Sequence, residues 1–433
     1  MVPIVSRRRS DEGGSRAISV FRNRWWVVAG SVIGLTVSAG PVNNFTFGVF
    51  VRAVTEDLHI GRGTFASAML ATNWIGAASG PVIGWLLDRY GARRVLLVGV
   101  TLFAGATAMQ SYITSSLLVL YLLFALKNLT SAGQSPVPYA FAVSKWFDRR
   151  HGLALGVALA GVGLGTSVVP LFAAYLTAHY GWRTAYVGLG LLILLLGGLP
   201  ALLLIREPSE RERAAMQPVA NGALPGYDFL FVLKGVRFWA LAFAFLLGVV
   251  ALNGIITQIV PILMDRGVPL QTAARDLAVS GIAALVGRIA SGWCLDRYHG
   301  PYIAVAFFVL PMIGISFFAS GAGEPWPLLG ALLCGAALGG EIDLMGFFVS
   351  RYFGLKSYGK IYGTMFGIFA GATGVGPFIS GYSFDRWHSY LPAFVLYEVV
   401  LAVACLTFLP LGEYPFPAHH RVGQSQAAEE AAA

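Results

Sequence analysis

Four ionisable residues lie inside long apolar runs of this 433-residue chain: Lys127, Arg288, Glu341 and Asp343. A charge in hydrocarbon is costly unless it faces water or a partner, so ionisable residues at that depth mark functional positions. A guanidinium offers a carboxylate a planar pair of hydrogen-bond donors, and a carboxyl group held out of water is able to bind and release a proton. These residue types predict binding of an organic anion together with proton transfer.

Arg288 lies eight residues before Asp296, where the apolar run ends. Along a helix this spacing corresponds to about 12 Å, so the guanidinium is expected inside the bilayer. We interpret Arg288 as the main anion contact. The alternative is permanent pairing with an acidic residue such as Glu341.

Lys127 is followed by Thr130, Ser131 and Gln134, at helical spacings of three, four and seven residues. This spacing gives one face of an otherwise apolar helix a polar character, and that face is predicted to line a wet cavity. We interpret Lys127 as a second anion contact. A structural ion pair, or a lysine that extends along its alkyl chain to the membrane interface, is the alternative.

Glu341 and Asp343 are two residues apart, which on a helix corresponds to about 200° of rotation. They are therefore predicted to face different surroundings, one the cavity and the other a neighbouring helix, Lys127 or Arg288. Both are candidates for proton coupling. The alternative for each is a purely structural ion pair.

Uncharged polar side chains complete the predicted substrate path, and several lie near prolines that bend helices. They are Asn43 and Asn44 beside Pro41, Gln134, Tyr139 beside Pro138, and Asn253 with Thr257 or Gln258. Amides of this kind also hold membrane helices together without contacting substrate, which is the alternative for each.

The composition is that of a membrane protein. With 56% hydrophobic and only 12% charged residues, the chain has too little polar surface to cover a soluble globule. The net charge of +9 is distributed between apolar runs, so no nucleic-acid partner is expected. Cys294, Cys334 and Cys405 all lie in apolar runs and imply no disulfide framework.

Segments of about 20 apolar residues are long enough to cross the bilayer as helices. We place twelve, at 25–50, 64–87, 95–114, 116–143, 152–178, 184–205, 236–264, 273–295, 302–320, 327–350, 360–384 and 391–411. The predicted domains are a cytoplasmic tail at 1–24, a six-helix bundle at 25–205, a cytoplasmic linker at 206–235, a second bundle at 236–411 and a cytoplasmic tail at 412–433.

The distribution of lysine and arginine supports this topology. With both termini cytoplasmic, 22 basic residues fall in cytoplasmic segments, six fall outside and two fall within spans. Such an excess on the cytoplasmic side is typical of multi-pass membrane proteins. The short loops favour a bacterial inner membrane, and we expect a monomer.

The two halves of the chain repeat each other. The stretch Gly84–Tyr90 recurs almost unchanged at Gly292–Tyr298, 208 positions later. A second set of matches has nearly the same offset, 207: Gly152 with Gly359, Gly156 with Gly363 and Pro170 with Pro377. We interpret the halves as a duplication whose glycines allow helices to approach closely while they move; tight packing alone is the alternative.

The stretch from Gly84 to Arg94, with its echo at Gly292 to Tyr298, resembles the loop between helices two and three of the major facilitator superfamily. Lys145–Gly156 and the later Tyr180–Arg183 are similar to its monocarboxylate porter and oxalate/formate antiporter branch. The resemblance implies an all-α membrane fold with twelve transmembrane helices in two pseudo-symmetric six-helix bundles. It also implies a substrate site near the midplane, alternating access, and Arg288 as the substrate-carboxylate arginine of the eighth helix.

Within that fold, the Asp-Arg turns are expected to latch the cytoplasmic side through charge-assisted bonds to helix ends. The residues concerned are Asp88, Arg89, Arg93, Asp296 and Arg297. The alternative is that these charges only set the membrane topology.

Two departures from the branch bear on the substrate. The lysine expected deep in helix eleven of oxalate carriers is absent, because Lys360 lies at the cytoplasmic mouth of that span. The lysine of the animal carriers in helix one is also absent, since residues 25–50 contain no ionisable side chain. A monoanion is therefore favoured over oxalate.

The sequence predicts a secondary active transporter of a small organic carboxylate, coupled to proton uptake and requiring no cofactor. An organic-anion exchanger or exporter, and a hydrophobic drug efflux carrier, are alternatives on the same fold. A membrane enzyme has the least support, because the sequence has no nucleophile elbow, phosphate-binding loop or clustered metal ligands.

Overall fold

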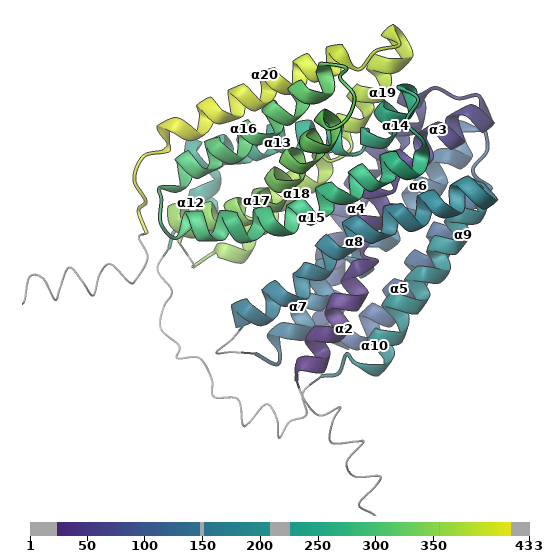
Figure 1. Cartoon of the computed structure of the whole chain (residues 1–433). Helices are drawn as coiled ribbons and strands as arrows, with labels where there is room; N and C mark the ends of the chain where they lie inside the picture. The colour runs from purple at the N-terminus through teal and green to yellow at the C-terminus, as the bar shows by residue number, and fades with distance from the viewer. Residues whose placement is uncertain (1–23, 148–150, 208–225, 355, 417–433) are drawn as a thin grey trace, which may run out of the picture.

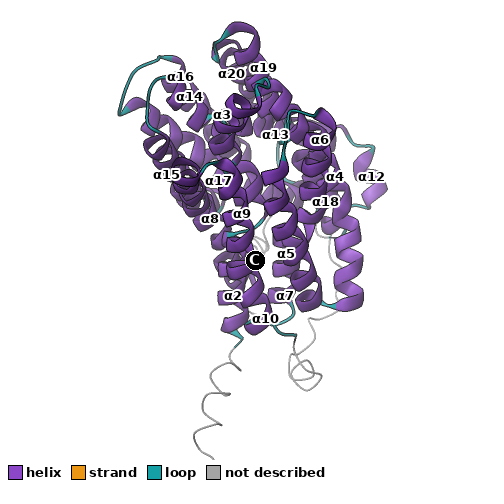
Figure 2. Ribbon diagram, turned by 90° about the vertical axis from the view of Figure 1, so that its right-hand side faces the viewer, coloured by secondary structure: helices purple, strands orange, loops and turns teal. Residues whose placement is uncertain are grey.

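The computed structural model describes residues 24–147, 151–207, 226–354 and 356–416. Helices make up nearly all of this described chain (Figure 2). They form two bundles of six spans each, so the predicted fold class is confirmed (Figure 1).

The N-terminal bundle contains the first six spans, several of them broken into shorter helices. Its elements are α2 (Trp25–Thr36), η1 (Gly40–Phe45), α3 (Phe47–Leu58), α4 (Arg62–Tyr90), α5 (Ala92–Ala108), η2 (Met109–Tyr112), α6 (Leu117–Ser131), η3 (Ala132–Gln134), α7 (Pro136–Ser144), α8 (His151–Tyr180), α9 (Trp182–Ile193), η4 (Leu194–Gly198) and α10 (Leu199–Leu203).

The C-terminal bundle is preceded by the short helix α12 (Phe229–Leu233). Its elements are α13 (Val236–Ile256), α14 (Ile259–Asp265), α15 (Leu270–Leu295), α16 (Gly300–Ala319), α17 (Trp326–Phe353), α18 (Tyr358–Ala372), α19 (Val375–Trp387), α20 (Leu391–Phe408) and η5 (Leu409–Leu411).

Ten helical segments of the described chain are long and apolar enough to cross a membrane. The other two predicted spans correspond to α4 and to α18 followed by α19. Glycine and polar residues interrupt the apolar sequence of α4, and the eleventh span divides at Thr373 and Gly374 into helices of 15 and 13 residues. Both spans nevertheless continue the two-bundle pattern.

Proline explains two of the breaks, because it has no backbone N–H and cannot continue the hydrogen-bond ladder. Pro41 lies in the π-helical turn η1 of span one. Pro136 begins α7 after Ser135, whose hydroxyl accepts a hydrogen bond from the Val137 N–H. These breaks turn the middle of spans one and four, where polar side chains are concentrated.

We call the side on which residues 24, 206 and 226 lie the linker side, and the opposite side the distal side. The bundles converge toward the distal side and separate toward the linker side (Figure 1). Helices α8 and α15, and likewise α4 and α19, pack against each other across the bundle boundary. On the linker side, a side chain at Gly84, Gly156 or Gly292 would meet open space.

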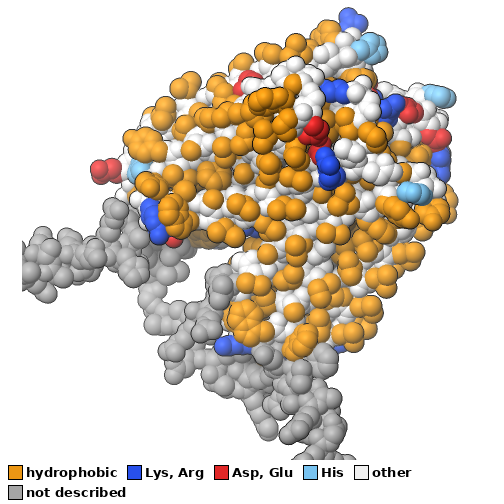
Figure 3. Space-filling model, in the orientation of Figure 1, with side chains coloured by type: hydrophobic (Ala, Val, Ile, Leu, Met, Phe, Trp, Pro, Cys, Tyr) orange, Lys and Arg blue, Asp and Glu red, His pale blue; other side chains and the backbone are white. Residues whose placement is uncertain are grey.

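The outer surface is suited to lipid. Hydrophobic side chains cover most of the face in Figure 3, whereas charged side chains gather toward its upper right, near the distal ends of the helices. The surface is notched between the two bundles on the linker side.

Glycines bring α15 and α17 into backbone contact within the C-terminal bundle. A Cβ atom at Gly335 or Gly339 would overlap the carbonyl of Ser280 or Ala284, and one at Gly287 would overlap Ala336. Lipid supplies no hydrophobic force between helices, so such small-residue crossings hold them together. This crossing positions the ionisable residues of both helices.

We predict that Gly339→Ala lowers the stability of the folded protein by about 1–3 kcal/mol, because the added methyl group collides with backbone that has no room to move. The measurement is the apparent unfolding temperature in detergent. The matched control is Gly292→Ala, also on the α15 side of the bundle, whose Cβ atom meets nothing within 4 Å. Equal behaviour of the two variants would contradict the close crossing.

Candidate functional site

Arg288 and Asp343 form an ion pair between α15 and α17. The Arg288 Nε atom lies 3.4 Å from Asp343 Oδ2, and the two side chains are 28% and 33% exposed. They meet because the glycine crossing holds the two helices in contact near this depth. The pair engages the guanidinium through its Nε atom. The terminal N–H groups of Arg288 are therefore able to donate hydrogen bonds to a further anion.

Glu341 lies in different surroundings, as the spacing of two residues predicted. Its side chain is buried within the C-terminal bundle against Gly248, which also contacts Phe308. Both carboxylate oxygens lack a hydrogen-bond partner in the described chain. Of the two acidic candidates, Asp343 is therefore the one that contacts Arg288, and the alternative pairing of Arg288 with Glu341 is not observed.

Lys127 on α6 is a cation buried within the N-terminal bundle. It is only 5% exposed, and its Nζ atom lies 4.8 Å from the centroid of the Phe124 ring and 6.0 Å from that of Tyr186. Within the described residues no carboxylate lies at ion-pair distance from it. The structural ion pair considered for Lys127 is thus not seen, and aromatic faces provide its surroundings instead.

Several uncharged polar residues predicted to line the path are buried inside the bundles. Gln134 donates to the carbonyl of Gly34 at 3.0 Å and accepts from the Tyr139 hydroxyl at 3.0 Å. The side chains of Gln134 and Tyr139 are fully buried. Gln258 and Asn253 are buried as well. In this conformation Gln134 and Gln258 donate to the backbone of a neighbouring span, whereas Asn253 donates to a carbonyl of its own helix. Contact of the four residues with substrate stays a prediction.

Asn43 and Asn44 are half-buried in η1. The Asn43 Oδ1 atom has no hydrogen-bond partner in the described part of the chain. Unpaired amide oxygens in a membrane helix are costly. Asn43 therefore keeps the role of a candidate substrate contact.

The Asp-Arg turns lie on the linker side, where the bundles are apart. Arg89 lies over Trp85, with its Cζ atom 5.4 Å from the ring centroid, and Arg297 lies over Trp293 at 4.1 Å. Arg93 donates to the carbonyl of Leu202 at 2.6 Å. Each of these contacts lies within a single bundle and does not connect the two. Asp296 is exposed, and the side chain of Asp88 lies outside the described structure. Their latching role stays a prediction.

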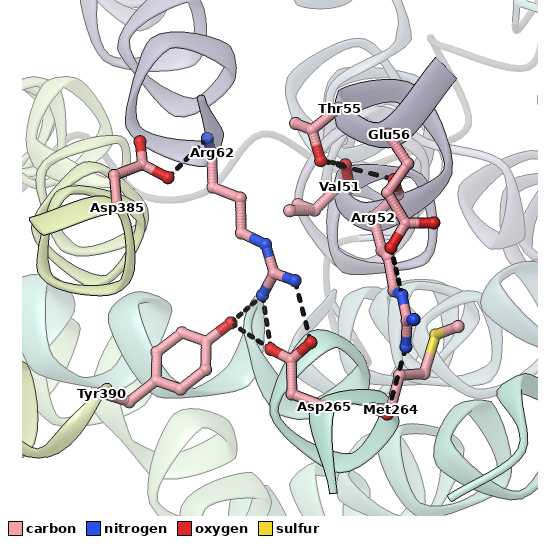
Figure 4. A network of polar contacts seen from close by, with 9 residues as sticks. All are labelled: Val51, Arg52, Thr55, Glu56, Arg62, Met264, Asp265, Asp385 and Tyr390. Atoms are coloured by element: carbon pink, nitrogen blue, oxygen red, sulfur yellow. Dashed lines mark hydrogen bonds and ion pairs between the residues drawn. The ribbon is translucent and has the colours of Figure 1, made fainter. Parts of the chain in front are cut away.

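A polar network that sequence reasoning did not identify joins the bundles on the distal side (Figure 4). Arg62 at the start of α4 donates to both oxygens of Asp265 on α14, at 2.5 and 2.8 Å, and to the Tyr390 hydroxyl at 2.5 Å. Its guanidinium also stacks on Phe384, 3.8 Å from the ring centroid. We call Arg62, Asp265, Asp385 and Tyr390 the distal latch.

Asp385 completes the distal latch through backbone contacts. Its two carboxylate oxygens accept hydrogen bonds from the N–H groups of Arg62 and Gly63, at 2.9 and 2.6 Å. Negative charge at a helix N-terminus is stabilised by the unpaired amides and the helix dipole. The carboxylate of one bundle thereby caps a helix of the other.

Further contacts close the same side. Arg52 on α3 donates to the carbonyl of Met264 at 3.1 Å and pairs with Glu56 (Figure 4). Nearer the middle of the membrane, Asn73 and Thr373 are hydrogen-bonded at 2.7 Å. All of these contacts except the Arg52–Glu56 pair connect one bundle to the other.

Two six-helix bundles that are latched on one side and separated on the other, with an ion pair between two membrane helices of the C-terminal bundle, have the architecture of a membrane transporter. The comparison with family models identifies the family: residues 32–377 match the Major Facilitator Superfamily. The chain belongs to this superfamily. Its relatives are transporters, and it is accordingly a transporter and not an enzyme.

Curated relatives connect the chain to the monocarboxylate transporters. Monocarboxylate transporter 13 of Bos taurus is 31% identical over 67% of this chain, and the match spans 66% of that relative, slightly under two thirds of its length. Monocarboxylate transporter 11 of Mus musculus is 26% identical over 90% of this chain and 86% of the relative.

Solved structures support the fold. A bacterial homologue of the human lysosomal transporter Spinster, in an inward-facing and occupied conformation, has a TM-score of 0.67 at 16% identity, covering 90% of this chain and 96% of that one. The nucleoside transporter NupG has a TM-score of 0.69 at 15% identity, and the match covers 90% of this chain and 100% of that one. At these identities the likeness concerns the fold alone.

We predict that Arg62→Ala shifts the protein at least about tenfold toward a conformation open on the distal side, because Asp265 loses the cation that pairs with it across the bundle boundary. The measurement is the distance between spin labels at positions 180 and 387, at the distal ends of α8 and α19, in a cysteine-free background. The double variant Arg62→Asp with Asp265→Arg is expected to restore the short distance.

The matched control is Arg183→Ala. It removes the Arg183–Asp57 pair, at 2.6 Å, which lies on the same side but within one bundle. The hydrogen bond from Arg183 lowers the pKa of Asp57, outside the membrane spans, so this pair is also charged at neutral pH. Opening by Arg183→Ala to the same extent would contradict the specific role of the distal latch.

Proposed function

We propose that the protein carries a small organic monocarboxylate together with a proton by alternating access. The observation that carries this proposal is the partly exposed Arg288–Asp343 ion pair between two membrane helices. Support also comes from the relatedness to monocarboxylate transporters. Lys127 and Asn43, in the N-terminal bundle, are the proposed anion contacts on the other side of the path.

Charge balance explains the proton. Without substrate, Arg288 and Asp343 neutralise each other. A substrate carboxylate that binds the remaining donors of Arg288 shares the guanidinium with Asp343 and leaves the site with one excess negative charge. In a medium of low dielectric constant that charge is costly, and protonation of Asp343 removes it. Anion and proton then cross together as a neutral unit.

The proposed orientation places the linker side in the cytoplasm, in agreement with the excess of basic residues there. The conformation with a closed distal latch is then the one open to the cytoplasm, and both termini are cytoplasmic. The Asp-Arg turns close the cytoplasmic side when the distal latch opens. A bacterial inner membrane and a monomeric state remain parts of the proposal.

We predict that Arg288→Ala abolishes saturable uptake of every monocarboxylate, with at least a hundredfold loss, and that Arg288→Lys restores a part of it, since a lysine keeps the charge but not the planar donor pair. The assay uses proteoliposomes and a panel of radiolabelled two- to eight-carbon acids, with protein-free vesicles as the background. Transport of neutral or cationic compounds that is indifferent to Arg288 would favour drug efflux instead.

We predict that Asp343→Asn makes transport independent of an inward proton gradient, while exchange of labelled for unlabelled acid continues, because the neutral amide mimics the protonated carboxyl. Glu341→Gln serves as the matched acidic control on α17 and is expected to keep coupled uptake. The measurement is the initial rate with and without the gradient. Loss of coupling in Glu341→Gln alone would move the proton site to Glu341.

A further inference from the structure

Three aromatic rings on α18 form a regular stack beside the Arg288–Asp343 pair. Tyr358, Tyr362 and Phe366 follow one another at four-residue spacing. The centroids of successive rings are 5.7 and 6.0 Å apart, with interplanar angles of 9° and 14°. We call these three residues the aromatic shelf.

The aromatic shelf is distinct from the core-facing side of α18. Ile361, Met365 and Phe369 are buried and pack in the bundle core. The shelf residues pack against the edge of this core and are all partly exposed. Phe369 stacks on Phe366 with centroids 5.8 Å apart and thereby anchors the distal end of the stack. The deepest core contacts of α18 are thus made by Ile361, Met365 and Phe369, and the shelf rings lie at the edge of the core.

The shelf lies next to the ion pair. Gly346 follows Asp343 by three residues on the same face of α17. A Cβ atom at Gly346 would lie 3.1 Å from the Tyr358 hydroxyl and 3.7 Å from Tyr362 Cε2, so both rings pack against this turn. Tyr362 is also close enough to Asp343 and Arg288 for their charges to act on its phenol group.

Space and polarity around the shelf are suited to a ligand. The neighbouring stripe of Gly359, Gly363 and Gly367 leaves open space, because a Cβ atom at any of them meets nothing within 4 Å. The Tyr362 side chain is partly exposed. Within the described residues its hydroxyl makes no hydrogen bond, so it is free to donate one to a ligand. A free phenol donor and a series of partly exposed ring faces therefore adjoin the cation.

We propose that the transported monocarboxylate carries a planar aromatic ring, which stacks on the aromatic shelf while its carboxylate binds Arg288. This inference rests on the proposed function and adds the substrate class. Aromatic rings prefer offset stacking at centroid separations of about 4.5–7 Å, so an aryl group extends the existing stack by one ring. A saturated acid of the same size makes apolar contact but lacks this interaction.

The experiment compares benzoate with cyclohexanecarboxylate, two monoanions that share a six-membered ring and differ in aromaticity. Binding to the purified full-length protein in detergent is measured by calorimetry, which avoids passive permeation of the acids. Wild type is expected to bind benzoate about fivefold more tightly. Tyr362→Leu and Phe366→Leu are expected to reduce this preference to within about twofold, whereas Tyr362→Phe retains it.

Tyr382→Leu is the matched control, since this residue is an exposed aromatic on α19 that stacks on Phe378 and lies outside the shelf. It is expected to leave the preference unchanged. Equal affinity of wild type for the two acids, binding of neither acid, or an unchanged preference in both leucine variants of the shelf would overturn the aromatic substrate class.

An Arg288→Ala arm separates this inference from the proposed function. If Arg288→Ala abolishes binding of both acids while wild type binds them equally, carboxylate recognition stands and the shelf is excluded. If both acids bind without Arg288, carboxylate recognition by this residue fails. Retention of the benzoate preference in that variant would then locate the ring on the shelf independently of the guanidinium.

Discussion

The constraint on which the molecule depends is the cost of placing a guanidinium and a carboxylate between membrane helices. Arg288 and Asp343 offset that cost by pairing with each other. The pair exists because α15 and α17 approach to backbone contact at Gly287, Gly335 and Gly339. Small residues at the crossing thus determine the position of the charges that we propose to bind the substrate anion and the proton.

The distal latch holds the two bundles together on one side of the molecule. An anion site at the centre is useful for transport only if it opens to one side at a time. Arg62 on one bundle is held by Asp265 and Tyr390 on the other, and Asp385 caps the helix that begins at Arg62. Four residues from separate parts of the chain therefore hold the bundles together on the distal side, whereas the bundles are apart on the linker side (Figure 1).

Sequence reasoning identified the twelve-span fold, because hydrophobic length is a local property. The duplication and the depth of Arg288 in the membrane stay predictions. Sequence reasoning did not decide between Glu341 and Asp343, since the rotation of α17 follows from glycine contacts with α15 that no single helix reveals. Gln134 and Tyr139 were expected in the path, but the break at η3 turns them toward each other. Their polar groups form hydrogen bonds inside the N-terminal bundle.

The residues of the distal latch and of the aromatic shelf were not predicted, because their local sequence is ordinary. Arg62 and Asp265 lie near span ends, where charges are common, and their pairing is visible only once the bundles are packed together. Tyr362 follows a helical spacing of aromatic residues that normally indicates core packing. An arginine directly after Gly61, at the start of a span, is the one signal that sequence alone offered.

Proton uptake on substrate binding tests the central claim most directly. Benzoate is added to the purified protein in weakly buffered solution near neutral pH, and the change in pH is recorded against the amount bound. The account predicts uptake of about one proton per bound anion in wild type and none in Asp343→Asn. Binding of benzoate by wild type without proton uptake would contradict it.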